Sequence, residues 1–524
     1  MTTKAASANT GSTQARMEPP ASGVRVRMYR QGHGDCFLLA FRQDNGDPFY
    51  LLIDCGMKRG SKLHREIREV AESIRDATGN HLHLVVVTHE HEDHVSGFRS
   101  EREVFDDLTV DKLWLAWTED PDNEVANELR TKHRDTLLGL VSAAERLRGA
   151  RDQADRQVHV MLEALLEFEL SEDDRALAVD KPDKIKGITN KEGILVVKRR
   201  ADERQGTEYL RPHSEPRTLP NVGGVRVFVL GPPENETQLK DMDPRGDEEF
   251  HLATAEKRAL AAQERLFLAA AEERSFLAAA APGVTGEQEA HQPFEPQHRI
   301  TFDAARSHPE YSGFFETHYG LDEEYRDEND ERHWRRIDAD WLRVAEHFAL
   351  RMGEFVNNTS LVLAIELPRS KKVLLFVGDA QRGNWVSWPE KKWDSANGLA
   401  AGEEVTVGDL LARTVFYKVG HHGSHNATLN KGGLQDMARG ELSDQFVAMI
   451  PANEKWALSN NTPPWRHPLP AIHKALLQKA RGRVFVMDRD LEAPGPQVLS
   501  PEKWQQFLDR STHNDLFCEF TVED

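Results

Sequence analysis

Cysteine is scarce in this chain: Cys36, Cys55 and Cys518 are the only three among 524 residues. An odd and sparse set of cysteines provides no disulfide framework and is typical of a reducing compartment. No apolar run approaches the roughly 18 residues that a bilayer crossing needs. Residues 1–22 lack the apolar core of a signal peptide and are rich in Ala, Ser, Thr and Pro. The sequence therefore predicts a cytoplasmic protein with no membrane partner and a disordered tail over residues 1–22.

Positive charge is also in short supply, because 67 Lys and Arg residues stand against 87 Asp and Glu residues. The resulting formal net charge of −20 argues against a broad basic surface for duplex DNA. It does not exclude a locally positive cleft, to which a bound divalent metal ion would itself contribute. Hydrophobic residues make up 39% of the chain and charged residues 29%, which fits a globular protein with a heavily solvated surface.

Strand-like and helix-like segments alternate near the start of the chain. Alternating or apolar runs predict two strands after Val24 and a third that ends at Asp54. Residues 61–77 have helical spacing, and "HLHLVVVT" is the next strand. This order of elements predicts an α/β scaffold, which we place at 23–100 and 222–510. The segments expected to interrupt it are a mainly helical insertion at 101–221 and a second helical insertion at 236–350 with a linker at 282–296.

The segment "VVVTHEHEDHVSGF" concentrates His89, His91, Asp93 and His94 directly after an apolar strand. Alternate residues of a strand share a face, so His89 and His91 are expected to point to one centre. A turn after them would let Asp93 and His94 face a neighbouring centre. Imidazole nitrogens suit zinc, iron or manganese, and a carboxylate adds a hard oxygen ligand. A run of charges is usually a solvated loop, but this spacing after an apolar strand favours a metal site.

Two later strand ends carry similar chemistry. Asp379 ends the apolar run "LLFVGDA", and His421 and His422 follow the strand "VFYKV". A single aspartate at a strand end is more often a cap or turn residue, but three such segments in one α/β chain favour a shared site. Ser424 and His425 lie in the same turn, where substrate contact and a plain turn are equally good interpretations.

These residues resemble the metallo-β-lactamase superfold. The matching pieces are Asp54 in "LLIDCG", the "HEHEDH" run, Asp379 in "FVGDA" and the histidines of "GHHGS". The segments "QGHGDCFLL", "NNTSLVLAIEL" and "NNTPPWRHPLP" are similar to signatures of the β-lactamase-like domain of ComEC-type DNA-uptake proteins and their soluble relatives. The resemblance implies an α/β fold, the four-layer αββα sandwich, with large helical insertions left unmatched.

The resemblance also implies one or two divalent metal ions at the sheet edge, with zinc as the first choice and manganese or iron as alternatives. The implied ligands come from three segments: His89, His91, Asp93, His94, Asp379 and either His421 or His422. The first two would bind one ion and the next two another, with Asp379 between them. Asp54 would orient this cluster from behind the ligands.

The chain departs from the family at Gly231, which stands about where a further histidine is expected. His213, His251 or His33 could substitute, and the sequence selects none of them. The first metal site would then be weak, completed by water or empty. His91 occupies a position where redox members of the superfold carry a glutamate, and this favours hydrolysis.

The leading functional hypothesis is a metal-dependent hydrolase, a phosphodiesterase or nuclease that uses metal-activated hydroxide. The residues expected to carry the reaction are Asp93, Asp379, His422 and Ser424, with His425 and His467 as candidate substrate contacts. Its partners would be a phosphodiester substrate, with nucleic acid as one candidate, and a second copy or another protein bound through the helical insertions. Alternatives are hydrolysis of a lactone or thioester, and a degenerate, non-catalytic partner-binding module.

Overall fold

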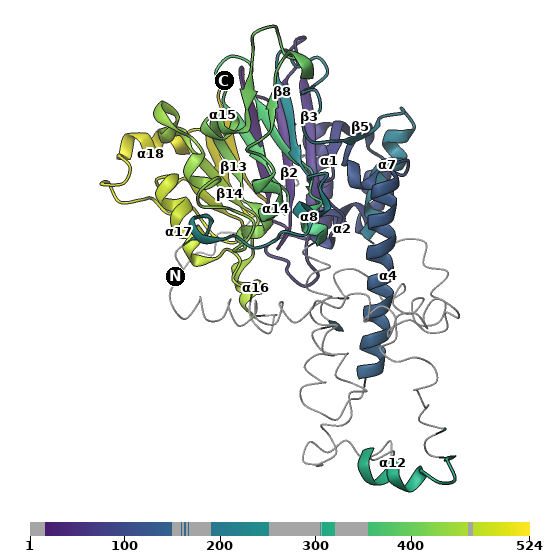
Figure 1. Ribbon diagram of the computed structural model, residues 1–524. Coiled ribbons are helices and arrows are strands. Elements are labelled where there is room, and N and C mark those ends of the chain that lie inside the picture. The colour runs from purple at the N-terminus through teal and green to yellow at the C-terminus, as the bar shows by residue number, and fades with distance from the viewer. Residues whose placement is uncertain are drawn as a thin grey trace, which may run out of the picture. The chain divides into compact units, whose positions relative to one another are not determined.

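The computed structural model describes residues 16–148, 190–250, 307–319, 355–459 and 465–524, and also residues 159, 162, 163, 166 and 304. The chain divides into two compact units. The first consists of Met1–Glu119, Glu192–Phe250 and Asn358–Asp524, and the second of Asp120–Lys191 and His251–Asn357. In the second unit, the described residues include helices α4 (Glu124–Leu147) and α12 (Ser312–Tyr319) (Figure 1).

The first unit is built on two sheets, of which the first has eight strands in the described part of the chain. Across this sheet their order is β16 (Ser511–His513), β17 (Phe517–Val522), β1 (Val24–Tyr29), β2 (Cys36–Arg42), β3 (Pro48–Cys55), β4 (His81–Val86), β5 (Thr109–Ala116) and β6 (Thr207–Leu210). Strands β3, β4, β5 and β6 run parallel to one another, whereas β17, β1, β2 and β3 pair antiparallel in that order. The carboxyl ends of β3 and β4 therefore lie at the same edge.

The second sheet has seven strands in the same described residues. Their order is β15 (Val484–Val486), β14 (Val447–Ile450), β13 (Thr414–Lys418), β10 (Val373–Phe376), β9 (Val362–Glu366), β8 (Arg226–Gly231) and β7 (Arg217–Thr218). Strands β9 and β10 pair antiparallel, and β10, β13 and β14 are parallel. The carboxyl ends of β10 and β13 thus also share an edge. A small separate pair is β11 (Lys392–Trp393) with β12 (Val405–Thr406).

The two sheets pack face to face through a core to which both contribute. Phe37 of β2 meets Phe376 of β10 edge to face, with ring centroids 5.7 Å apart. Burying a side chain of this size fully stabilises the fold by about 1.5–3 kcal/mol. The alternate residues of β2, Leu38 and Ala40, are apolar and buried as well, so the outer face of this sheet also needs a covering layer.

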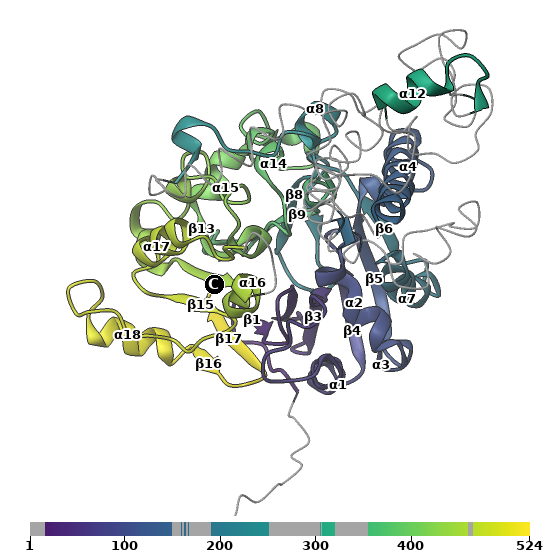
Figure 2. The ribbon, with the colours of Figure 1, turned by 90° about the horizontal axis from the view of Figure 1, so that it is seen from below.

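Helices cover both outer faces (Figure 2). On the first sheet these are α1 (Ile67–Thr78), α2 (Glu92–Ser100), α3 (Arg102–Asp106) and α7 (Asn190–Asp202), whose apolar residues join one buried cluster. On the second sheet they include α14 (Arg382–Val386), α15 (Val407–Ala412) and α17 (Pro470–Lys479). Trp385 of α14 packs against Tyr417 of β13 at 6.3 Å between ring centroids. The result is a four-layer αββα sandwich. Shorter helices are α8 (Glu236–Leu239), α16 (Glu454–Ser459) and α18 (Pro501–Leu508).

Helix α1 shows how local sequence sets these elements. It begins at Ile67, after a capping box in which Glu66 and Glu69 bond each other's backbone N–H groups. Val70 and Ile74 are buried, as the predicted helical spacing requires. Gly79 ends the helix with φ 61°, the left-handed conformation that a residue without a Cβ adopts at least cost. The segment is therefore shorter at its start than the helix expected over 61–77.

Some segments differ from the expected organisation. Within the segment expected to be a tail, residues 16–22 are described: Met17 is buried, and its carbonyl accepts a hydrogen bond from the Tyr50 hydroxyl at 3.1 Å. The range 101–221, expected to be mainly helical, includes strands β5 and β6 of the first sheet. The second helical insertion expected at 236–350 lies mostly outside the described residues, and the linker at 282–296 lies wholly outside them. Among the described helices, none combines the length and apolar character that crossing a membrane requires.

Candidate metal centre

The three ligand-rich segments converge on one edge of the sandwich. Strand β4 ends at Val86, where its pairing with β3 and β5 stops, and the chain then turns. His89 and His91 consequently lie in a loop, with His91 as the N-cap of α2, and not on a strand as the sequence predicted. Asp93 and His94 occupy the first turn of α2.

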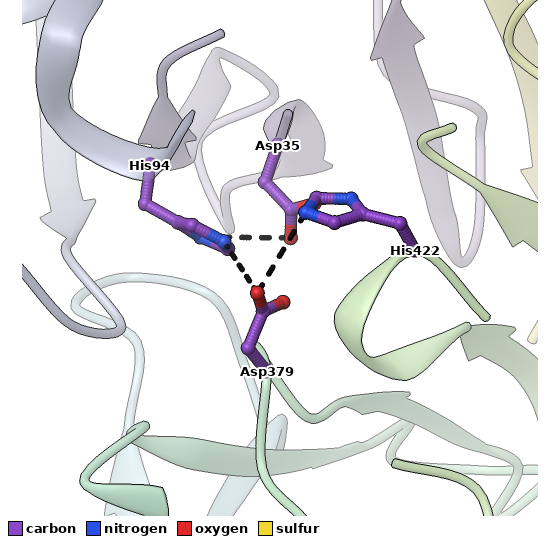
Figure 3. Close-up of side chains that lie close together, drawn as sticks. All are labelled: Asp35, His94, Asp379 and His422. Carbon is purple, nitrogen blue, oxygen red and sulfur yellow. Dashed lines mark ion pairs between the residues drawn. The ribbon is translucent and has the colours of Figure 1, made fainter. Parts of the chain in front are cut away.

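Four buried side chains face one another at this edge (Figure 3). They are Asp35, His94, Asp379 and His422, and one ligand atom from each lies within 4.8 Å of the others. None is more than 1% exposed. Asp35 directly precedes β2, Asp379 follows β10, and His422 lies in the turn after β13. Four chain segments thus supply two carboxylates and two imidazoles, the ligand types that zinc, manganese and iron share.

Hydrogen bonds on the far side of each ring orient the two imidazoles. His94 Nδ1 lies 2.8 Å from Asp54 Oδ2, and His422 Nδ1 lies 2.9 Å from the carbonyl oxygen of Pro451. Since each of these partners accepts, both Nδ1 atoms carry a proton and both Nε2 atoms are directed into the cluster, where a bound cation would take their lone pairs in place of a proton. His94 Nε2 is 3.2 Å from Asp379 Oδ2, and His422 Nε2 is 3.7 Å from the same oxygen.

Asp54 is itself held rigidly behind His94. Its two oxygens accept from the backbone N–H of Thr88 at 2.8 Å and from the Thr88 hydroxyl at 2.7 Å. Asp54 is the penultimate residue of the buried strand β3 and has φ 56°, a left-handed conformation that turns its side chain toward His94. Such an orienting carboxylate behind a ligating histidine is a recurrent feature of metal sites.

The residues present fit a divalent cation. In the described part of the chain, Asp35 Oδ1, Asp379 Oδ2 and His94 Nε2 are buried and make no hydrogen bond. Burial alone would lower the pKa of His94, but the carboxylates of Asp379, Asp35 and Asp54 raise it well above 6.5. The cluster therefore attracts positive charge strongly enough to hold a proton on a buried imidazole. A metal ion would satisfy the same demand and the same orphaned atoms.

Two buried lysines supply part of the positive charge. Lys418 Nζ is in contact with Asp35 Oδ2 and lies 3.4 Å from Asp379 Oδ1. Lys58 Nζ lies 3.0 Å from Asp93 Oδ1, while the other oxygen of Asp93 is 2.7 Å from His422 Nε2. Burial would raise the pKa of Asp93, but the charge of Lys58 and the hydrogen bond from His422 lower it well below 3.8. Burial raises the pKa of Asp35 to about 6 in spite of Lys418.

The pair His89 and His91 lies beside this cluster. His89 Nε2 is 3.1 Å from His91 Nδ1, so these two ring nitrogens are hydrogen bonded to each other. His89 Nδ1 is 3.3 Å from the Ser360 hydroxyl, and the His89 and His94 rings are 4.1 Å apart between centroids. Burial and the neighbouring imidazoles lower the pKa of His89 well below 6.5.

His421 and His422 differ in what they can do. His421 has φ 42°, and its Nε2 lies 3.9 Å from Asp379 Oδ2, with 22% of the side chain exposed. The Ser424 hydroxyl donates to Asn426 Oδ1 at 2.9 Å, so at 3.0 Å it accepts from His421 Nδ1–H. This leaves the His421 Nε2 lone pair on the side of Asp379. Burial lowers the pKa of His421 to about 3, which keeps the ring neutral.

A second set of rings continues from His422 toward the surface. His33 is fully buried, and its ring centroid lies 4.2 Å from that of His422 and 5.5 Å from that of His467. The ring centroid of Trp456 lies 5.1 Å from that of His33, and the ring centroid of Trp465 lies 5.6 Å from that of His467. Both tryptophans and His467 are half-buried. These aromatic side chains form one wall beside the cluster.

The remaining residues proposed from the sequence make other contacts, lie outside the described residues or, at Gly231, have no room for a side chain. His425 Nε2 pairs with Asp243 at 3.1 Å. His213 packs on Trp393 and contacts a backbone carbonyl of β11, and His251 lies outside the described residues. At Gly231 an added Cβ would lie only 2.0 Å from Asn384 Oδ1, so no side chain fits there. None of the described candidates thus takes the place of the expected third histidine.

A separate group of His81, His83 and Asp111 also brings ligand atoms together. It lies at the first residues of β4, the opposite end from His89. His81 Nε2 is 2.7 Å from Asp111 Oδ2, but His83 Nδ1 accepts the backbone N–H of Tyr50 at 3.1 Å. Neutral His83 then carries its proton on Nε2 and offers no lone pair to a metal. We therefore do not count this group as a metal site.

Three functional residues were not singled out from the sequence: Asp35, Lys58 and Lys418. Asp35 precedes the apolar run "CFLLAF", and Lys418 ends the apolar strand "TVFYK". A charged residue at the end of a buried strand is the signal that both share with Asp54 and Asp379. Lys58 follows β3 in a polar segment, where nothing in the sequence distinguishes it from a surface lysine.

Two facing sheets carry a buried carboxylate and imidazole cluster at one edge, an arrangement that suits a metal-dependent hydrolase. More particularly, residues 29–110 match the Metallo-beta-lactamase superfamily. The matched segment includes β2, β3, α1, β4 and α2, and so carries Asp35, Asp54 and the histidine run. Searches of curated proteins and of solved structures find no match for the chain. The predicted α/β sandwich is confirmed, and the closer likeness to ComEC-type proteins stays a prediction.

Proposed function

We propose that this protein is a metal-dependent phosphodiesterase that cleaves a nucleotide-containing substrate such as single-stranded nucleic acid. The observation that carries the proposal is the buried cluster of Asp35, His94, Asp379 and His422, bordered by the "GHHGS" turn and by His467. A divalent ion bound there would lower the pKa of a water molecule to about 7 and act as a Lewis acid toward a phosphoryl oxygen.

The neighbouring side chains have roles that follow from their hydrogen bonds. His421 is neutral, and its Nε2 lone pair lies near Asp379, so it can bind a cation or accept a proton at that atom. Ser424 has already committed its hydroxyl proton to Asn426. We therefore assign Ser424 as the positioning residue of His421 rather than as a nucleophile.

His467 presents a hydrogen-bond donor to the site. The backbone N–H of Asn453 donates to His33 Nδ1 at 3.2 Å, so neutral His33 carries its proton on Nε2. That proton points to His467 Nδ1 at 3.4 Å. His467 must then carry its own proton on Nε2, where it can donate to a phosphoryl oxygen that gains negative charge in the transition state. Burial lowers the pKa of both rings well below 6.5 and keeps them neutral.

The aromatic wall supports a nucleotide as the substrate. Trp456 and Trp465 stand next to His33 and His467, and both are half-buried. Stacking of a base on an aromatic side chain contributes about 1–3 kcal/mol and tolerates any sequence. The net charge of −20 makes this local mode of binding more suitable than a broad electrostatic surface.

The proposal is tested by metal-dependent hydrolysis of bis(p-nitrophenyl) phosphate and of fluorescent single-stranded DNA. We expect activity in the wild type that a chelator removes and added Mn²⁺ or Zn²⁺ restores. Asp379→Asn and His422→Ala should lose it, whereas Asp47→Asn, an exposed carboxylate change, should not. Hydrolysis of a lactone or thioester panel with no turnover of either phosphodiester would contradict the proposal and favour a carbonyl substrate.

A further inference from the structure

We propose that the chain binds one divalent metal ion, among Asp35, His94, Asp379 and His422, and that His89 and His91 hold no second ion. This inference deepens the proposed function and rests on its metal-dependent part. It assigns Asp35 as a ligand, a residue outside the ligand set that the sequence suggested. The inferred site holds one ion and so differs from the two-ion arrangement that the "HEHEDH" run predicts.

The first reason is that the second ligand set is incomplete. His89 and His91 use one ring nitrogen each to bond one another at 3.1 Å. A third imidazole from Gly231 is excluded, because Asn384 fills the space that its Cβ would need. Asn384 is fully buried and is fixed by a 2.9 Å hydrogen bond from its side-chain nitrogen to the Asn358 carbonyl. The obstacle is thus a packed amide and not a mobile surface group.

The second reason is charge. Four carboxylates contact the imidazoles or ammonium groups of the cluster: Asp35, Asp54, Asp93 and Asp379. Lys58 and Lys418 are buried against two of them. With all imidazoles neutral, four negative and two positive groups leave a net charge of −2, which one divalent ion that displaces the His94 proton neutralises. A second divalent ion would add two uncompensated positive charges to a buried site, where a charge without a partner is costly.

The third reason is that the lysines occupy oxygen atoms that a second ion would need. Lys58 Nζ is 3.0 Å from Asp93 Oδ1, and the other oxygen of Asp93 faces His422 Nε2 at 2.7 Å. Lys418 Nζ is 3.4 Å from Asp379 Oδ1, which leaves Asp379 Oδ2 directed at His94. A bridging role for Asp379 would require its Oδ1 to exchange Lys418 for a metal ion.

The test is metal content by mass spectrometry on the full-length chain, stripped with chelator, reloaded with excess Mn²⁺ or Zn²⁺ and desalted. We expect one equivalent in the wild type and in His91→Ala, and far less than one in His94→Ala and Asp35→Asn. His64→Ala, at an exposed histidine, is the control. Mn²⁺ bound to the wild type should give the EPR spectrum of an isolated ion.

Two equivalents in the wild type that fall to one in His91→Ala would overturn the inference, and so would none in the wild type. Circular dichroism checks that each variant folds, and His89→Gln replaces His91→Ala if that variant does not. Phosphodiesterase activity is measured on the same samples. Two equivalents with activity would refute the single ion alone, whereas one equivalent without hydrolysis of either phosphodiester would refute the proposed function alone.

Discussion

The ammonium group of Lys418 is in contact with the carboxylate of Asp35, and both are buried at the point where the cluster gathers its negative charge. A buried ion pair of this kind makes each partner dependent on the other, because removing one leaves an uncompensated charge. Burial would lower the pKa of Lys418, but Asp35 and Asp379 raise it above 10.5, so the lysine stays charged. A resident cation and Lys418 therefore neutralise the same carboxylates.

Lys418→Met should make folding depend on metal. Loss of the ammonium group leaves Asp35 unpaired and destabilises the metal-free chain by about 3–5 kcal/mol. A bound divalent ion compensates the same carboxylate, so the rise in melting temperature on adding Mn²⁺ or Zn²⁺ should be larger in the variant than in the wild type. Lys112→Met, which removes a partly exposed pair with Glu208, should show the wild-type rise. Equal rises in all three proteins would show that Lys418 and the ion do not share a carboxylate.

Asp54→Asn should weaken metal binding without removing a ligand. Asp54 fixes the proton of His94 on Nδ1 at 2.8 Å, which directs the Nε2 lone pair into the cluster. Loss of such an orienting carboxylate typically costs about 10-fold to 100-fold in metal affinity. Isothermal titration of the chelator-stripped protein measures this loss directly, with Asp47→Asn as the exposed control. Unchanged affinity in Asp54→Asn would mean that His94 is oriented by its packing alone.

His33 and His467 should act as one unit in catalysis. His467→Ala is expected to lower kcat by about 10²–10³, as loss of one transition-state donor does. His33→Phe keeps a ring in the stack but removes the Nε2–H that orients His467, and the resulting misplacement should lower kcat by about 10-fold to 100-fold. His33→Gln retains a donor group and should recover part of this loss. The double variant should be no slower than His467→Ala. Additive losses would show that His33 does not act through His467.

The fold followed from the sequence because its signals are local. Apolar runs such as "FYLLIDC" mark buried strands, and the spacing of Val70 and Ile74 marks a helix face, so the alternation of elements could be predicted. The convergence of Asp379 and His422 on His94 also followed, since strand ends of parallel segments meet at a common edge. These predictions need only the periodicity of each segment and the geometry of a sheet.

The rest of the site depended on contacts between distant residues. Asp35 and Lys418 are separated by most of the chain, and neither has a neighbour in sequence that suggests an ion pair. His89 and His91 were expected on a strand, but the pairing of β4 stops at Val86 and sheet pairing cannot be read from one segment alone. That His422, and not His421, lies in the four-residue cluster depends on distant contacts such as that with the carbonyl of Pro451, a backbone atom from a third segment.

Gly231→Ala should destabilise the fold, because the packing that excludes a third histidine also excludes a methyl group. The added Cβ would overlap Asn384 Oδ1 at 2.0 Å and approach Val362 at 3.1 Å. Overpacking of a buried site costs about 1–3 kcal/mol, which should appear as a lower melting temperature.

Gly408→Ala, in an exposed position of helix α15 with no atom closer than 3.6 Å, is a matched control of opposite sign, with a gain of about 0.4–1 kcal/mol. In an Asn384→Ala background the penalty at Gly231 should shrink, since the overlapping amide is gone. If Gly231→Ala proved neutral in both backgrounds, the space beside β8 would be open, and a side chain there could complete a second metal site.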